Sequence, residues 1–158
     1  MTRAGILAAG VSMTVLAAPG VAAAELGSTT TLNGETPPGV MAAMSDLAVI
    51  IDTVQEDGQR LLVQEGTRKP GTRSPIQYHD FAGQTCVTAG TITHFVEARD
   101  PVDYPSGTCY EIPPDVAMTA ANLGTEDVRI IDTFLAPPDA PTIIVIEPGW
   151  PDLTDPTG

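Results

Sequence analysis

Residues 71–122 read GTRSPIQYHDFAGQTCVTAGTITHFVEARDPVDYPSGTCYEIPPDVAMTAAN. Short runs rich in β-branched and aromatic residues alternate here with breaks that contain Gly and Pro. Many short strands at regular turn spacing are typical of an all-β sandwich or barrel. Because no 3.6-residue apolar repeat extends over ten residues after position 24, little helix is expected. The extended segments predicted along the chain are 47–51, 61–63, 74–79, 84–88, 91–97, 108–112 and 128–134.

The clearest strand pairing precedes residues 71–122. The runs LAVII at 47–51 and LLV at 61–63 are apolar and rich in branched side chains, and Asp57-Gly58 lies between them. An Asp-Gly dipeptide favours the positive φ angles of a tight hairpin turn. We therefore expect these two runs to form paired antiparallel strands.

Two motifs within residues 71–122 resemble the two sequence motifs of the cupin family. The first contains Gly71, Gln77-Tyr78-His79, Gln84 and Gly90, and the second contains Gly107, Pro113-Pro114-Asp115, Met118 and Asn122. The spacer 91–106 matches the short spacer of compact bacterial cupins. The resemblance implies an all-β fold, namely an antiparallel, cupin-like jelly-roll β-barrel, which we expect over residues 47–136.

The same resemblance locates a candidate pocket. In metal-binding cupins the first motif supplies two histidines and a glutamate, and the second supplies a third histidine. These positions are occupied here by Gln77, His79, Gln84 and Met118. Only His79 is a usual ligand, because an amide oxygen is a weak neutral donor and a thioether suits soft ions. We expect no tightly bound cofactor, and a pocket in which the four side chains surround a small organic ligand.

Other interpretations of this pocket stay open. One is a metal-dependent enzyme of the cupin oxygenase or isomerase type that retains a divalent metal through an altered ligand shell. Another is a copper site, since His79, Met118 and Cys86 are soft or borderline donors. His79 is also the one candidate catalytic residue, as a general base or as a group that orients a ligand. His94 has no motif role and is expected to pack in the core or to face solvent.

Cys86 and Cys109 are the only two cysteines of the chain. In an exported protein they can form a disulfide, because oxidising compartments preserve such bonds. The alternative is two buried thiols, because free cysteine also behaves as a small apolar core residue.

The amino terminus predicts export. Residues 1–24 contain Arg3, an apolar run at 4–18 and the small-residue triplet 22–24, which together are typical of a secretory signal peptide. The apolar run is shorter than the ~20 residues that a membrane-spanning helix needs. We expect a secreted or periplasmic protein that is not held in a membrane after cleavage.

The remaining organisation is simple. Residues 25–46 are predicted to be a flexible arm before the barrel at 47–136. Residues 137–158 are predicted to be a tail rich in Pro and Asp, with one strand at 142–146 and with Trp150 and Leu153 pinning it.

Charge excludes one class of partner. The chain has a formal net charge of −13, and Lys69 is its only lysine. It therefore offers no basic patch that could neutralise nucleic-acid phosphates or anionic lipid headgroups.

The apolar runs 47–51 and 142–146 need a covering surface, because native proteins protect apolar sheet edges. We expect a homodimer, and the barrel serving mainly as an assembly unit is a further alternative.

Overall fold

The computed structural model describes residues 27–150, and all regular elements in this range are β-strands. The predicted signal peptide at 1–24 and the end of the tail at 151–158, including Leu153, lie outside the described residues. Within the described range no helix could span a membrane. The strands are β1 (Val40–Met41), β2 (Ser45–Val54), β3 (Arg60–Arg68), β4 (Thr72–Arg73), β5 (Gln77–Tyr78), β6 (Gly83–Ala89), β7 (Thr91–Val96), β8 (Val102–Pro105), β9 (Cys109–Ile112), β10 (Met118–Ala121), β11 (Val128–Ala136) and β12 (Ile144–Val145).

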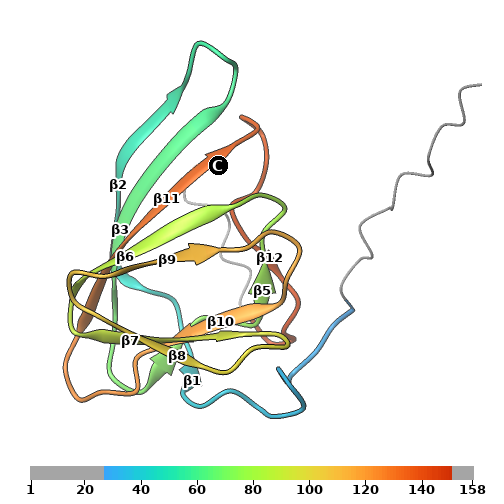
Figure 1. Cartoon of the computed structure of the whole chain (residues 1–158), viewed down its shortest axis with the longest axis vertical. Coiled ribbons are helices and arrows are strands. Elements are labelled where there is room, and N and C mark those ends of the chain that lie inside the picture. Colours follow the sequence, from blue (N-terminus) through green and yellow to red (C-terminus); the bar gives the residue numbers. More distant parts are fainter. Residues whose placement is uncertain (1–26, 151–158) are drawn as a thin grey trace, which may run out of the picture.

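The strands form two sheets that face each other (Figure 1). The first sheet has the order β2-β3-β11-β6-β9. The second has the order β1-β4-β10-β5-β12, and β7 and β8 extend it through the pairing of β7 with β10. Within these sheets only β1 and β4 pair in parallel. The prediction of an antiparallel all-β fold is confirmed, although β1, β4, β8 and β10 had no clear signal in the sequence.

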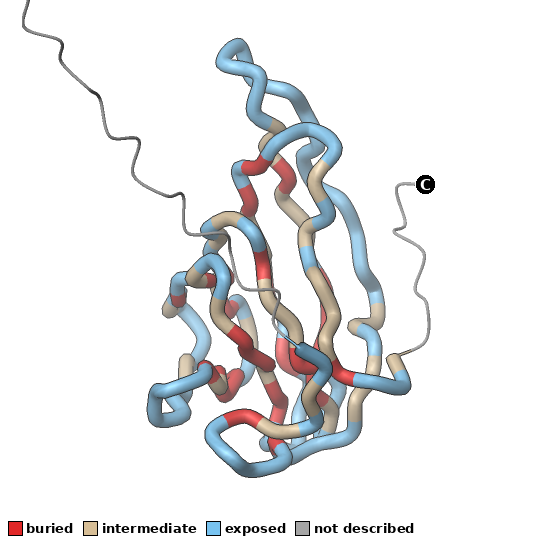
Figure 2. The backbone as a smooth tube through the Cα atoms, turned by 90° about the vertical axis from the view of Figure 1, so that its right-hand side faces the viewer, coloured by how far each residue is buried: buried red, intermediate tan, exposed pale blue. Residues whose placement is uncertain are grey.

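The predicted hairpin is present as β2 and β3. Val54 is the register partner of Arg60, and the turn is closed by a 2.7 Å hydrogen bond from the Gln55 amide to the Gln59 carbonyl. Gly58 has a φ of 84°, as the Asp-Gly signal predicts. The hairpin tip is exposed and extends beyond the rest of the barrel (Figure 2).

Both sheets contribute to one apolar core. Phe134 of β11 is 2% exposed, and its ring packs against the His79 ring at 5.3 Å and the Phe81 ring at 6.1 Å between centroids. Burying a side chain of this type stabilises the fold by about 1.5–3 kcal/mol. The buried members of the core are Val87, Ile92, Val96, Tyr110, Ile112, Met118, Val128, Ile130 and Phe134.

Gly90 allows the chain to pass from one sheet to the other. β6 belongs to the first sheet, β7 belongs to the second, and Gly90 is the single residue between them. Its φ is 75°, in the left-handed region that favours glycine. A Cβ atom here would lie 2.8 Å from Cγ2 of Val128. A side chain is therefore excluded by both backbone conformation and space.

The two cysteines form a disulfide in the structure. Cys86 of β6 and Cys109 of β9 are register partners in neighbouring strands of the first sheet. Their side chains lie on the outer face, because Thr85 and Val87, which flank Cys86, are buried. The disulfide therefore joins the edge strand β9 to the sheet from outside the core.

Residues 27–46, expected to form part of a flexible arm, pack against the barrel instead. Leu32 is 4% exposed and joins Ile76 and Ala117 in a small apolar cluster. The side-chain amide of Asn33 donates to the carbonyls of Val96 and Arg99, each at 3.1 Å. One leucine and one asparagine make these contacts, and neither belongs to a periodic pattern that the sequence could reveal.

The segment after β11 is joined to the second sheet. The strand predicted at 142–146 is observed as β12, which pairs with β5. Arg73 donates two hydrogen bonds of 2.6 Å to the carboxylate of Glu147, and the amide of Ile76 donates a third at 2.8 Å. Burial raises the pKa of Glu147, but these hydrogen bonds outweigh it and lower the pKa overall. Glu147 therefore stays ionised within a buried ion pair.

We predict that Glu147→Gln strongly destabilises the fold. The Arg73 and Glu147 side chains are only 6% and 7% exposed, so the variant leaves a buried guanidinium without its anion. Breaking a buried pair in this way costs about 3–5 kcal/mol. Unfolding in urea measures the loss, and replacing both partners by Met and Leu should recover most of it.

The matched control is Asp127→Asn. This change removes the exposed pair between Lys69 and Asp127, whose side chains are 51% and 47% exposed. Exposed pairs contribute little because water screens them. Equal losses of stability in Asp127→Asn and Glu147→Gln would contradict the importance of the buried pair.

Candidate functional site

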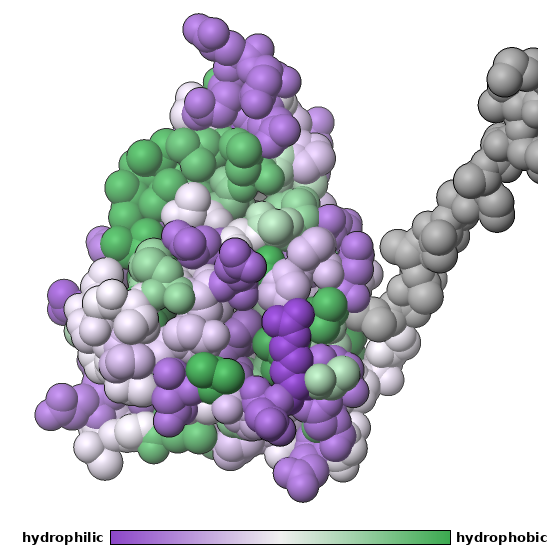
Figure 3. Space-filling model, in the orientation of Figure 1, coloured by the Kyte–Doolittle hydropathy of each residue, from purple (hydrophilic) through white to green (hydrophobic). Residues whose placement is uncertain are grey.

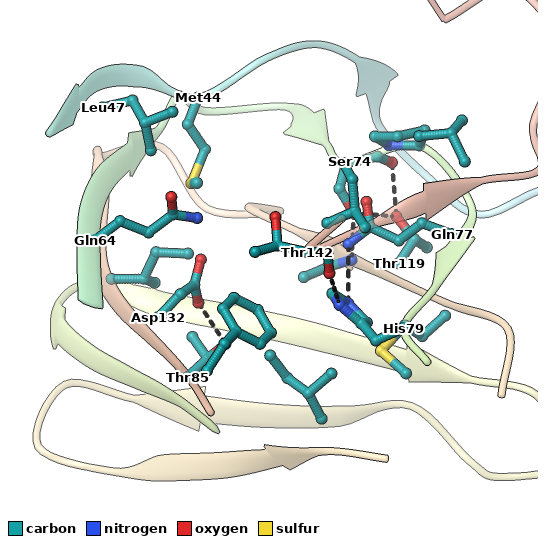
Figure 4. A pocket seen from close by; sticks show the side chains of 18 of the residues that line it. Met44, Leu47, Gln64, Ser74, Gln77, His79, Thr85, Thr119, Asp132 and Thr142 are labelled. Atoms are coloured by element: carbon teal, nitrogen blue, oxygen red, sulfur yellow. Dashed lines mark hydrogen bonds between the residues drawn. The ribbon is translucent and has the colours of Figure 1, made fainter. Parts of the chain in front are cut away.

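A cavity of about 470 Å³ is lined by side chains from both sheets. From β3 it receives Arg60, Leu62, Gln64 and Arg68, because alternate side chains of a strand face the same side. Gly66 occupies the same row and contributes no side chain. Apolar side chains form most of the lining, and polar side chains lie among them on both sheets. Figure 4 shows Gln64, Thr85 and Asp132 on one side of the cavity and Gln77, His79, Ser74 and Thr119 on the other.

Three of the four positions named from the cupin motifs meet at this cavity. Gln77, His79 and Met118 all line it, and Met118 of β10 is the register partner of Gln77 in β5. Met118 is 3% exposed and also belongs to the apolar core. These three side chains come from the second sheet and the loop that follows β5.

Gln84 does not line the cavity, so its assignment to the pocket is wrong. It is exposed on the outer face of β6, and Thr85, which is 1% exposed, faces the interior in its place. Successive side chains of a strand point to opposite faces, so a shift of one residue exchanges inside and outside. The motif spacing alone therefore did not identify which side chain of β6 faces the cavity.

His79 is held by both of its ring nitrogens. Nδ1 is hydrogen-bonded to the carbonyl of Thr142, so it carries the proton and donates. Nε2 is then the acceptor, and the side-chain amide nitrogen of Gln77 lies 3.4 Å from it. Burial lowers the pKa of His79, and the bond to Thr142 raises it less, so the ring is neutral at pH 7. This arrangement orients His79 as a polar wall of the cavity.

His94 also lines the cavity, a role that the sequence did not indicate. It is 6% exposed, and its ring lies 4.3 Å from the Tyr110 ring and 6.4 Å from the Tyr104 ring. Burial, followed by the charge of Arg99, lowers the pKa of His94 to about 4. Both histidines of the chain are therefore uncharged inside the barrel at neutral pH.

Asp132 is the acidic side chain of the cavity. The hydroxyl of Thr85 donates a 2.6 Å hydrogen bond to its Oδ1. Burial raises the pKa of Asp132 from 3.8 to about 6, although Thr85, Arg68 and Gln64 act in the opposite direction. The only sequence signal for this residue was a single acid inside the β-branched run 128–134.

Ser74 lies at the cavity but is not arranged as a nucleophile. Its hydroxyl is 3.0 Å from the hydroxyl of Thr119, which itself donates to the Ser74 carbonyl at 2.7 Å. The amide of Ala120 donates to the Ser74 hydroxyl at 3.1 Å. These bonds tie β10 to the segment after β4, which is a structural role.

The residues at the cavity do not fit a hard divalent metal. Among residues 27–150 no three His, Cys, Asp or Glu side chains come together as a ligand set. Of the motif positions only His79 offers a strong donor, and its acceptor nitrogen faces Gln77. A copper site cannot include Cys86 as a thiolate ligand, because Cys86 forms a disulfide with Cys109 on the outer face.

We predict that Asp132→Asn stabilises the protein at pH 7.5. Because the pKa of Asp132 is raised on folding, the folded state binds a proton that the unfolded chain has lost between about pH 4 and 6. The ionised Asp132 carboxylate therefore destabilises the folded state by up to about 3 kcal/mol above pH 6. This cost is absent below pH 4, where the carboxyl group is protonated in both states. Urea unfolding should show a gain for the variant at pH 7.5 that vanishes near pH 4.

The wild type and the variant contain the same two histidines, so the contribution of their titration cancels in the difference between the two stabilities. Asp103→Asn is the matched control, because Asp103 also accepts a 2.6 Å bond from a threonine, Thr93, but is exposed. A gain for Asp132→Asn that does not change with pH, or a loss at pH 7.5, would contradict the raised pKa.

Comparison with known proteins adds evidence on the fold. No protein-family model and no curated protein matches the chain. Solved structures do match, at identities below 25%. One is a conserved protein with a double-stranded β-helix domain from Klebsiella pneumoniae, with a TM-score of 0.52 and 18% identity over 68% of this chain and 90% of that chain.

Two further structures agree with it. A cupin family protein from Methanocaldococcus jannaschii has a TM-score of 0.50 and 16% identity, and covers 66% of this chain and 93% of that chain. A cupin-like protein from Thermotoga maritima has a TM-score of 0.50 and 19% identity, over 65% and 80% of the two chains. The expected jelly-roll architecture is confirmed, and the chain has the cupin, or double-stranded β-helix, fold.

Proposed function

We propose that the protein is exported and that its barrel cavity binds a small organic ligand without a tightly bound divalent metal. The observation that carries the proposal is the cavity itself, which has about 470 Å³ of space and a largely apolar lining with polar side chains among it. Sites for small molecules typically have this size and composition, with polar groups that fix orientation. Gln77, His79 and Asp132 are the groups that would orient the ligand.

The donor chemistry supports binding over metal-dependent catalysis. A cupin oxygenase or isomerase would need several imidazole or carboxylate donors directed at one point. The cavity offers His79 and His94 with Asp132, which do not form such a group within the described residues. We therefore favour the binding function over the enzymatic alternative.

Export to the periplasm or the medium has two supports. Residues 1–24 have the pattern of a secretory signal peptide. Cys86 and Cys109 form a disulfide, and disulfides persist mainly in oxidising compartments outside the cytoplasm.

The expected homodimer is supported by the edge strand β2. This strand pairs only with β3, so one side of its backbone is unpaired. Figure 3 shows a continuous hydrophobic area beside the hydrophilic hairpin tip, where Figure 1 places β2. The exposed apolar side chains of β2 are Leu47, Val49, Ile50, Ile51 and Val54.

Ligand binding is predicted to change the fluorescence of Trp150 and to raise the melting temperature. Trp150 is the only tryptophan of the chain and lines the cavity. A panel of small organic acids, amides, alcohols and sugars should contain compounds that produce both effects. Ala43→Phe, which adds bulk to an exposed residue of the cavity lining, should weaken both.

Ala82→Phe is the matched control, because Ala82 is equally exposed but does not line the cavity. Manganese and zinc, tested alone, should leave the melting temperature of the wild type unchanged. A ligand at ~100 times its dissociation constant adds about 2.7 kcal/mol to the folded state, so tight metal binding would be obvious. Stabilisation by metal and not by any organic compound would favour the enzymatic alternative.

We also predict that Ile50→Glu produces a monomer. Ile50 is 51% exposed in the apolar edge strand, so a charge there disfavours burial between two copies without disturbing the core. Sedimentation at micromolar concentration should show a dimer for the wild type and a monomer for the variant. A wild type that is already monomeric would remove the proposed dimer.

A further inference from the structure

Arg68 is a buried cation without an anionic partner. Its side chain is 5% exposed, and Nη1 donates to the carbonyl of Ala42. Its Nε atom is buried and has no hydrogen-bond partner. Arg73 is equally buried but is paired with the carboxylate of Glu147 through two bonds. Since an unpaired buried charge is costly, the isolation of Arg68 requires an explanation.

The position of Arg68 makes it accessible from the cavity. It belongs to the row of β3 side chains that includes Leu62 and Gln64 and faces the interior. Between Gln64 and Arg68 the row contains Gly66, against which Met44 packs. Met44 therefore fills the row between Gln64 and Arg68, and a ligand reaches the guanidinium group through the part of the cavity wall that Arg68 itself forms.

Asp132, the acidic side chain of the cavity, forms no ion pair or hydrogen bond with Arg68 in the described structure. Asp132 is the register partner of Gln64, whereas Arg68 is opposite Val128, four residues away along β11. Four residues of strand span about 13 Å. Arg68 lowers the pKa of Asp132 through its charge, whereas Thr85 and Gln64 lower it through hydrogen bonds to the carboxyl group.

Arg68 stays charged in this environment. Burial lowers the pKa of its guanidinium to about 10, which is still well above neutral pH. Arg60 also lines the cavity but is paired with Asp52 through two hydrogen bonds of 2.7 Å, so Arg68 is the cation that a ligand can neutralise. The walls beside it are apolar, and they include Leu47, Val49, Leu62, Ile143, Val145 and Trp150.

We propose that the ligand of this cavity is an amphipathic monocarboxylate, whose acid group binds Arg68 and whose apolar body lies against these walls. The inference rests on the proposed binding function and names its ligand class. A carboxylate matches the planar donors of a guanidinium and can accept two hydrogen bonds from it. A phosphate dianion fits less well, because Arg68 supplies one positive charge and Arg60, the other cation of the lining, is paired with Asp52.

The test compares two probes of the same length, octanoate and octanamide, at pH 7.5. Trp150 fluorescence and calorimetry follow their binding to the full-length exported protein. Octanoate should bind the wild type at least ten times more tightly than octanamide. Arg68→Gln should remove this preference by weakening octanoate at least tenfold while leaving octanamide unchanged.

Two further variants complete the design. Arg129→Gln removes the same charge from an exposed position outside the cavity and should bind both probes as the wild type does. Arg68→Lys keeps the charge but not the paired donors and should lie between the wild type and Arg68→Gln. Because Arg68→Gln removes an unpaired buried charge, we expect its melting temperature without ligand to be no lower than that of the wild type.

The results separate the two proposals. If octanoate and octanamide bind equally to the wild type and to Arg68→Gln, the carboxylate anchor is wrong while the binding function stands. If neither probe binds the wild type, the monocarboxylate class is wrong, and the compound panel decides the binding function separately. A loss of octanoate binding in Arg129→Gln as large as in Arg68→Gln would show only a general charge effect and would overturn the site.

Discussion

The carboxylate of Glu147 is the contact on which the cavity depends. It accepts two hydrogen bonds from Arg73 and one from the backbone of Ile76, all in a buried environment. Glu147 follows closely after β12, so these bonds fix the segment whose Thr142 carbonyl binds the His79 ring. Two parts of the chain that are far apart in sequence therefore form one wall of the cavity.

Local turn chemistry and alternation made much of the fold predictable. The hairpin turn at Asp57-Gly58 was predictable, because the positive φ of Gly58 is a local property of the turn and needs no distant contact. Which of the two side chains, Gln84 or Thr85, faces the cavity was not predictable in the same way. It depends on the residue at which β6 starts, and a strand of the opposite phase has an equally plausible sequence.

The charged residues of the cavity gave the weakest sequence signal. Arg68 and Asp132 lie within strands that the sequence indicated in part, but their position at the cavity results from the packing of β3 and β11 against the other sheet. Leu32 illustrates the same limit, because it is buried by Ile76 and Ala117, which are distant along the chain. Contacts of this kind have no short-range pattern.

The disulfide joins β6 and β9 of one sheet, although the chain between them forms β7 and β8 of the other. In the reduced chain, the pairing of Cys86 with Cys109 has to close a loop with a sequence separation of 23 residues. Folding becomes slower as contacting residues lie further apart along the chain. The bond makes this distant pairing a local one, so the oxidised chain is expected to fold faster than the reduced chain. The redox state of the protein's surroundings is therefore expected to influence how fast the chain folds.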